Sequence, residues 1–210
     1  AVASGRTAAG AEAVASHTGS MARADQAMDA VLARAGVLRF DDARALVQAA
    51  AALAIAEPPR GRRVAVLCNA GGPGILALDA AVEAGLAPAA LSEATRADLA
   101  RTQSPFAAVG VMTDVAATAG PDAVGDAVRA IVSDPGVDAL LGALVTPFFV
   151  DCDALAQRAV QALAVGGRPA VVALLRDPRF ESVASVFTSA GVPVVDFPQD
   201  AARVLAAMAH

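Results

Sequence analysis

From residue 62 onward, short runs of apolar residues alternate with segments whose apolar residues recur every three or four positions. The first pattern predicts buried strands and the second predicts amphipathic helices. The expected strands are 63–68, 86–91, 137–145, 169–174 and 193–195. The expected helices are 75–84, 93–101, 121–132, 151–164, 180–190 and 198–208, and 102–120 is expected to be irregular. This alternation predicts an α/β domain of flavodoxin-like type, a doubly wound parallel sheet of five strands in three αβα layers.

The first 57 residues follow mainly the helical pattern. Helices are expected over 21–35, with Ser20 as N-cap, and over 42–56, capped by Asp41 or Asp42, with a short extended piece at 37–40. Two consecutive prolines cannot continue a helix and predict a linker over 58–61. We therefore expect a partial helical piece of a neighbouring domain in 1–57 and a complete domain in 62–210. Because the chain starts without methionine, it is expected to come from a longer protein.

Composition narrows the class of protein. Of the 210 residues, 56% are hydrophobic and 18% charged, the net charge is −5, and aromatic residues are 3%. An acidic chain poor in aromatic residues argues against nucleic-acid binding. Cys68 and Cys152 are too few for a disulfide framework or a zinc site, so no metal is expected. No uninterrupted apolar run is long enough to span a membrane, and a cytoplasmic location is expected.

The segment 4–20 combines glycines, hydroxyl side chains and one of the two histidines, His17. Read as a loop, it offers backbone amides and donors for an anion, and imidazole is a nucleophile at neutral pH. The candidate phosphate ligands are Gly5, Arg6, Thr7, Ser16, Thr18, Gly19 and Ser20. Because the loop precedes the helix expected over 21–35, a phosphate on His17 would face a helix N-terminus. The alternative is a flexible loop of small residues with a capping serine and an exposed histidine.

A second glycine-rich turn, 69–74, follows the first expected strand and opens a helix. Such a turn presents backbone amides at the carboxyl edge of a parallel sheet, where ligands bind in α/β proteins. Its candidate ligand-binding residues are Asn69, Gly71, Gly72 and Gly74. The turn lacks the lysine of a phosphate-binding P-loop and the spacing of a dinucleotide fingerprint. The alternative is a tight turn that needs glycine only for its geometry.

Both motifs resemble those of the NDP-forming acyl-CoA synthetases (ADP-forming acetate–CoA ligases), in the succinyl-CoA synthetase superfamily. The pattern G-R-T-x-x-G-A-x-A-x-x-S-H-T-G-S at 5–20 is similar to that family's phosphohistidine loop, and N-A-G-G-P-G at 69–74, followed by Asp79, to the opening of its CoA-ligase domain. The resemblance implies that 1–57 ends the phosphohistidine domain and that 62–210 is the CoA-ligase domain. It also implies a ligase that converts acyl-CoA, ADP and phosphate into acid, CoA and ATP through a phosphate on His17.

Two segments depart from the family pattern. Val111 and Met112 stand where the family has Asn-Pro, so Asp114 is interpreted as a loop cap rather than a ligand. Pro147, Phe148 and Phe149 replace the glycines of a phosphate-holding turn, and an acid-capped helix is expected after them. The aromatic pair is available for contact with another domain.

What the resemblance implies beyond this chain concerns partners and cofactors. The family's CoA-binding and ATP-grasp domains, in the same or another subunit, are expected partners, with a small acyl substrate and self-association into a homo-oligomer. The chain alone is expected to be inactive and to bind no cofactor, whereas the complete enzyme uses CoA and ATP or ADP with Mg²⁺. Two alternatives stay open: a non-catalytic regulatory module of a synthetase-like protein acetyltransferase fusion, and an unrelated doubly wound nucleotide-binding domain.

Overall fold

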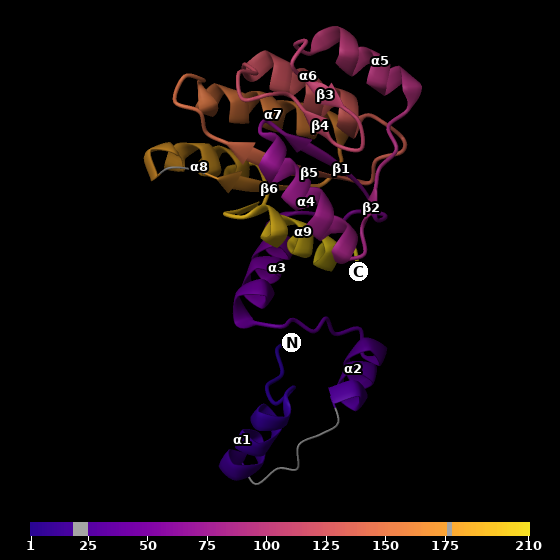
Figure 1. Ribbon diagram of the computed structural model, residues 1–210, viewed down its shortest axis with the longest axis vertical. Helices are drawn as coiled ribbons and strands as arrows, with labels where there is room; N and C mark the ends of the chain where they lie inside the picture. Colours follow the sequence, from indigo (N-terminus) through magenta and orange to yellow (C-terminus); the bar gives the residue numbers. More distant parts are fainter. Residues whose placement is uncertain (19–24, 176–177) are drawn as a thin grey trace. The chain divides into compact units, whose positions relative to one another are not determined.

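The computed structural model describes residues 1–18, 25–175 and 178–210. They form two compact units, Ala1–Ala50 and Ala51–His210. The second unit is built on a seven-stranded sheet, which Figure 1 shows with helices on both faces. Its strands are β1 (Arg63–Cys68), β2 (Ala87–Pro88), β3 (Ala108–Val109), β4 (Thr113–Asp114), β5 (Ala139–Val145), β6 (Ala170–Leu175) and β7 (Val194–Val195).

The strand order is β3-β4-β1-β5-β6-β7, and β2 also pairs with β1. Arg63 at the start of β1 lies opposite Ala87 of β2, and Cys68 at its end lies opposite Asp114 of β4. Since β5 occupies the other edge of β1, β2 and β4 share one edge. The five expected strands thus follow the order second, first, third, fourth, fifth, and the flavodoxin-like prediction is confirmed.

The β3–β4 pair corrects one expectation. These strands pair antiparallel and lie inside 102–120, which the sequence pattern predicted to be irregular. Each has only two residues. A two-residue strand is too short to show the alternation from which strands are inferred.

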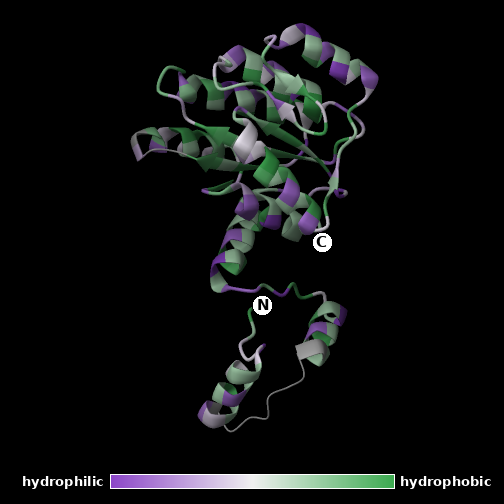
Figure 2. Ribbon diagram, in the orientation of Figure 1, coloured by the Kyte–Doolittle hydropathy of each residue, from purple (hydrophilic) through white to green (hydrophobic). Residues whose placement is uncertain are grey.

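Helices cover both faces of the sheet and bury its side chains. One face is covered by α4 (Gly71–Glu83) and α9 (Pro198–Met208), and the other by α5 (Glu93–Thr102), α6 (Pro121–Val132), α7 (Cys152–Gly166) and α8 (Glu181–Ser189), which a 3₁₀ turn, η1 (Pro178–Phe180), precedes. Along β5, Leu140 and Leu144 join the core under α6 and α7, whereas Leu141 joins the core under α4 and α9. Figure 2 shows the strands as predominantly hydrophobic, as a sheet buried on both faces requires.

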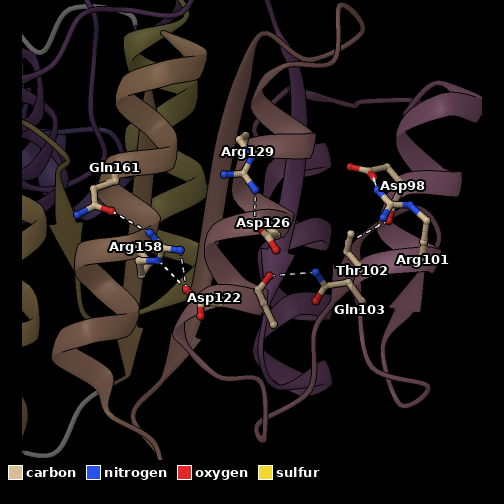
Figure 3. Close-up of polar contacts among 10 residues, drawn as sticks. Asp98, Arg101, Thr102, Gln103, Asp122, Asp126, Arg129, Arg158 and Gln161 are labelled. Carbon is tan, nitrogen blue, oxygen red and sulfur yellow. Dashed lines mark hydrogen bonds and ion pairs between the residues drawn. The ribbon is translucent and has the colours of Figure 1, made fainter.

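Polar contacts link the outer helices α5, α6 and α7 (Figure 3). Arg158 Nε of α7 donates to Asp122 Oδ1 of α6 at 2.8 Å, and Gln103 Nε2 after α5 donates to the carbonyl oxygen of Ala123 at 2.9 Å. The Arg158 and Asp122 side chains are exposed, and exposed ion pairs stabilise by at most about 1 kcal/mol. The buried apolar cluster therefore holds this layer on the sheet.

The first unit contains α1 (Ala8–Thr18), α2 (Asp25–Arg34) and the start of α3 (Ala43–Ile55). Val2 forms a parallel bridge with Phe40, and Phe40 N donates to Ala1 O at 2.8 Å. The extended piece expected at 37–40 thus pairs with the N-terminal residues. Asp42 is the N-cap of α3, because its Oδ1 accepts a hydrogen bond from Ala45 N at 2.8 Å.

Candidate functional site

The segment that carries His17 is a helix rather than the predicted loop. Thr7 caps the start of α1: its Oγ1 accepts a hydrogen bond from Gly10 N at 3.1 Å. Five of the first eight residues of α1 are alanine, the residue with the highest helix propensity, and one glycine does not outweigh them. The Thr7 hydroxyl, predicted to bind phosphate, is engaged in holding this helix end.

His17 is exposed and lies in the last turn of α1. The hydroxyl of Ser16 beside it donates to Ala13 O at 2.9 Å. His17 lies at the C-terminal end of its own helix, which presents the negative end of its dipole there. The described part of α2 is Asp25–Arg34, so whether His17 faces the N-terminus of that helix stays a prediction. Thr18 ends α1, and Gly19, Ser20 and the expected start of a helix at residue 21 lie outside the described residues.

The residues just before α1 adopt a glycine-dependent turn and form an ion pair with the segment before α3. Gly5 has φ = +86°, and a Cβ there would lie 3.2 Å from Val14 Cγ2. Glycine is required by this left-handed conformation. Arg6 forms an ion pair with Asp41. Asp41 therefore serves as the partner of Arg6, while Asp42 caps α3.

The turn between β1 and α4 opens at the carboxyl edge of the sheet. Ala70 occupies the N-cap position of α4 in extended conformation, and alanine has no side-chain oxygen to cap the helix. Gly71 and Gly72 are the first two helical residues, and Pro73, the third, has no amide hydrogen. Two backbone N–H groups and the positive end of the helix dipole therefore face this edge without a side-chain cap.

Gly74 is required by packing. A Cβ at this position would lie 2.4 Å from Cys68 Sγ and 3.0 Å from Met112 Sδ. The absence of a side chain lets the first turn of α4 pack directly on the end of β1. A Cβ at Gly72 would meet nothing within 4 Å. The two glycines thus differ: Gly74 serves packing, whereas Gly72 leaves space in front of the helix.

Asn69, predicted as a ligand, joins two strands. Its Nδ2 donates to Val145 O at 3.0 Å, and its Oδ1 accepts from Val145 N at 2.8 Å. The residue is 2% exposed. Both polar atoms of the amide are occupied by the backbone at the end of β5, so Asn69 extends the β1–β5 pairing.

The strand β4 brings a carboxylate beside this turn. Asp114 Oδ1 accepts from Ala116 N at 2.9 Å, and Oδ2 would lie 3.3 Å from a Cβ built on Gly71. The expectation that Asp114 caps a loop is confirmed.

Ala116 has φ = +68°, a left-handed conformation that an alanine rarely adopts and that the sequence did not signal. Burial, and after it the charge of Asp114, raise the pKa of Cys68 to about 12, so this thiol stays protonated at neutral pH.

The helix that follows β5 begins with a side-chain cap. Asp151 is the N-cap of α7, and its Oδ1 accepts from Ala154 N at 2.9 Å. The rings of Phe148 and Phe149 pack edge to face with centroids 5.3 Å apart, and the two residues are 85% and 58% exposed. The expected acid-capped helix is confirmed.

Asp79 of α4 is exposed and lies more than two helical turns after Gly71, so its carboxylate does not reach the start of α4.

The part of the chain that the structure describes offers neither a metal cluster nor a membrane span. It contains no group of three or more His, Cys, Asp or Glu side chains placed to hold a metal ion. Among the same residues, no helix has both the length and the apolar character that crossing a bilayer needs.

The chain matches two families of known domains. Residues 1–53 match the succinyl-CoA ligase like flavodoxin domain, and residues 64–209 match the ligase-CoA domain. The chain therefore belongs to the ligase-CoA domain family. The resemblance to ADP-forming acyl-CoA synthetases, inferred from the two glycine-rich motifs, is confirmed.

Similar proteins include subunit alpha of the ADP-forming acetate–CoA ligase II of Pyrococcus furiosus, which is 30% identical over 97% of this chain and 45% of its own length. The ADP-forming 4-hydroxybutyrate–CoA ligase of Nitrosopumilus maritimus is 24% identical over 98% of this chain and 29% of its own length. A solved acetyl-coenzyme A synthetase 1 of Ca. Korarchaeum cryptofilum, in complex with phosphate and ADP, has a TM-score of 0.88 at 25% identity, over 97% of this chain and 44% of that chain. The chain thus spans less than half the length of these relatives.

Proposed function

We propose that this chain is part of an ADP-forming acyl-CoA synthetase in which His17 carries a phosphoryl group between two sites. The observation that carries the proposal is the exposed imidazole of His17 within an intact G-R-T…S-H-T-G-S motif. The similarity to ADP-forming CoA ligases along almost the whole chain supports it.

The proposed reaction has three transfers. Phosphate attacks the thioester carbon of acyl-CoA, and the displaced CoA thiolate takes up a proton, which gives an acyl phosphate. An imidazole nitrogen of His17 then attacks phosphorus and releases the carboxylate. Finally, the terminal phosphate oxygen of ADP takes the phosphoryl group from His17, which forms ATP and restores the imidazole. A histidine suits this exchange because neutral imidazole is a nucleophile near physiological pH.

The position of His17 at the end of α1 is electrostatically unfavourable for a phosphoryl group. Phosphorylation adds negative charge at the C-terminal end of α1, where the helix dipole disfavours it by about 0.3–1 kcal/mol. The phosphoryl group therefore needs donors from outside α1. Backbone amides such as those of Gly71 and Gly72 at the start of α4 have the chemistry required.

Within this proposal, 1–57 is the C-terminal part of the phosphohistidine domain, 58–61 the linker and 62–210 the CoA-ligase domain. CoA-binding and ATP-grasp domains, in the remainder of the protein or in a second subunit, supply the other sites in a cytoplasmic homo-oligomer. Mg²⁺ is expected with the nucleotide, but the described residues hold no cluster that fits it, so no step is assigned to a metal here. The chain alone is proposed to be inactive.

Phosphate transfer from labelled ATP tests the role of His17. The full-length protein is incubated with [γ-³²P]ATP and Mg²⁺, and the label is assayed for acid lability and base stability. The label is expected to be lost in His17→Ala and His17→Asn, because neither side chain offers an imidazole. His210→Asn, which removes the only other histidine, is the matched control and should keep the label. A wild-type protein that takes up no such label overturns the proposal.

A second candidate is a regulatory module of a synthetase-like protein acetyltransferase fusion. The closed start of α7 favours it, because Asp151 and the Phe148–Phe149 pair occupy a turn that is glycine-rich in the catalytic family. If the full-length protein transfers acetyl groups from acetyl-CoA to protein lysines and takes up no phosphate on His17, this candidate replaces the first.

A further inference from the structure

A cavity of about 300 Å³ opens at the amino edge of the sheet, at the opposite edge from the α4 and α7 turns. It lies wholly within the second unit, where α3, α7 and α8 end and β6 begins. Its apolar wall includes Ile55, Val160, Leu163 and Val192. This volume is at the lower end of the range for small-molecule sites, so it suits a ligand of few atoms.

Two charged side chains, Arg168 and Glu57, also line this cavity. Arg168 Nε is buried and has no hydrogen-bond partner in the described part of the chain. The nearby Asp138 does not supply one, because it accepts from Arg63 Nη2 at 2.7 Å and from Arg63 Nε at 3.0 Å. Hydrogen bonds from Arg63 come first among the causes that lower the pKa of Asp138, and the charge of Arg168 adds to them. The unpartnered Nε leaves the guanidinium incompletely hydrogen-bonded, and the half-buried Arg168 side chain as a whole lines the cavity, where a carboxylate could pair with it.

The same cavity presents negative charge to a ligand. Three helices end around it, α3 at Ile55, α7 at Gly166 and α8 at Ser189, and helix C-termini carry partial negative charge. The carbonyl oxygen of Ile55 points toward Gly191, at which a Cβ would lie 3.0 Å from it. Together with the carboxylate of Glu57, which directly precedes the linker, these groups suit an ammonium. One cavity therefore offers a guanidinium, a carboxylate with helix C-terminal carbonyls, and an apolar wall.

We propose that this cavity binds a free aliphatic α-amino acid. Its carboxylate pairs with Arg168, its ammonium faces Glu57 and the C-terminal end of α3, and its side chain packs on Val160, Leu163 and Val192. Such a ligand contacts the end of α3, Glu57 and α7. Its binding would therefore make the packing of α3 on the rest of the second unit depend on the amino-acid concentration. This site is independent of the phosphoryl transfer proposed for His17.

Titration calorimetry of the full-length protein with L-valine at millimolar concentration tests the proposal. Saturable binding with one site per chain is expected. Arg168→Gln should weaken it about tenfold or more, because a charge-assisted hydrogen bond is lost. Glu57→Gln should weaken it by roughly threefold, since Glu57 is exposed. Ala164→Leu, which fills the cavity from an exposed lining position, should abolish it.

A control variant and a control ligand test the specificity of this site. Arg129→Gln on α6 removes an arginine outside the cavity and should leave binding unchanged. Isovalerate, which has the carbon skeleton of L-valine but lacks the ammonium, should bind more weakly than L-valine, and equal binding overturns the assignment of a zwitterion. If Arg168 only balances the helix dipoles, Arg168→Gln lowers the melting temperature but leaves valine affinity intact, which contradicts the proposal. The absence of saturable binding by the wild-type protein does so too.

Discussion

The helices α4 and α7 follow the neighbouring parallel strands β1 and β5, yet their N-termini differ. Helix α4 starts with Ala70, Gly71 and Gly72, which offer no side-chain oxygen, so its first amides are uncapped. Helix α7 starts with Asp151, whose carboxylate takes the amide of Ala154. Both helix ends lie at the carboxyl edge of the sheet. The glycine-rich one has no side-chain cap, although the Asp114 carboxylate lies beside it, whereas the other is capped by its own aspartate. The fold thus places two helix N-termini in equivalent positions at the edge of the sheet, and the local sequence decides which of them carries its own side-chain cap.

The largest effect expected in this comparison comes from Gly74. Gly74→Ala places a Cβ against Cys68 and Met112 and should lower the free energy of unfolding by about 3 kcal/mol. Gly72→Ala is the matched control, since it adds the same atom to open space in the same helix. Urea unfolding of both variants measures the difference. Equal stability of the two would show that close packing of α4 on β1 does not depend on Gly74.

The next effect concerns the link between the two turns. Asn69→Ala removes both hydrogen bonds to Val145 and leaves a partly buried N–H and C=O without partners, at a cost of about 2 kcal/mol. Hydrogen exchange at the Val145 amide should become faster than at neighbouring β5 amides. Unchanged exchange at this amide is the result that speaks against a structural role for Asn69.

A smaller effect is expected at the capped helix. Asp151→Ala removes the N-cap of α7 and should destabilise the second unit by about 1 kcal/mol. Asp151→Asn keeps a side-chain oxygen and should cost only a few tenths of a kcal/mol. Thermal melts of the two variants measure both losses, and a loss in Asp151→Asn as large as in Asp151→Ala would assign the effect to charge rather than to the cap.

The smallest effect has the opposite sign. Ala116→Gly relieves a left-handed conformation that costs an alanine about 1–2 kcal/mol, and part of this gain is offset by the greater entropy of glycine in the unfolded chain. We expect a net stabilisation of about 0.5 kcal/mol, measured as a higher melting temperature. Ala117→Gly is the control beside it, as residue 117 has no positive φ, and should be destabilising.

The longer strands of the sheet were predictable because each is a continuous run of apolar residues in the sequence. Buried parallel strands read as apolar runs such as 63–68 and 137–145, and their spacing leaves room for the crossover helices. The acid cap at Asp151 was also predictable, since the preference for aspartate at this position is local.

Other parts of the site depend on information that local patterns do not contain. The role of Asn69 depends on Val145, which lies far along the sequence, and no local pattern signals the positive φ of Ala116. The segment around His17 was interpreted as a loop from its glycines and hydroxyls. Its alanines and the Thr7 cap favour a helix more strongly, and the motif alone did not reveal this balance.

The edges of the sheet have a consequence for association between copies of the chain. The edge strands are β2 and β3 on one side of the sheet and β7 on the other, and each has only two residues. Short edge strands leave few unpaired backbone groups on which a strand from another molecule could add, so they protect a sheet against aggregation. If copies of this chain associate through the second unit, as proposed above, we expect them to use side-chain surfaces, and exposed apolar residues of α4 such as Ile75 and Val82 are candidates for it.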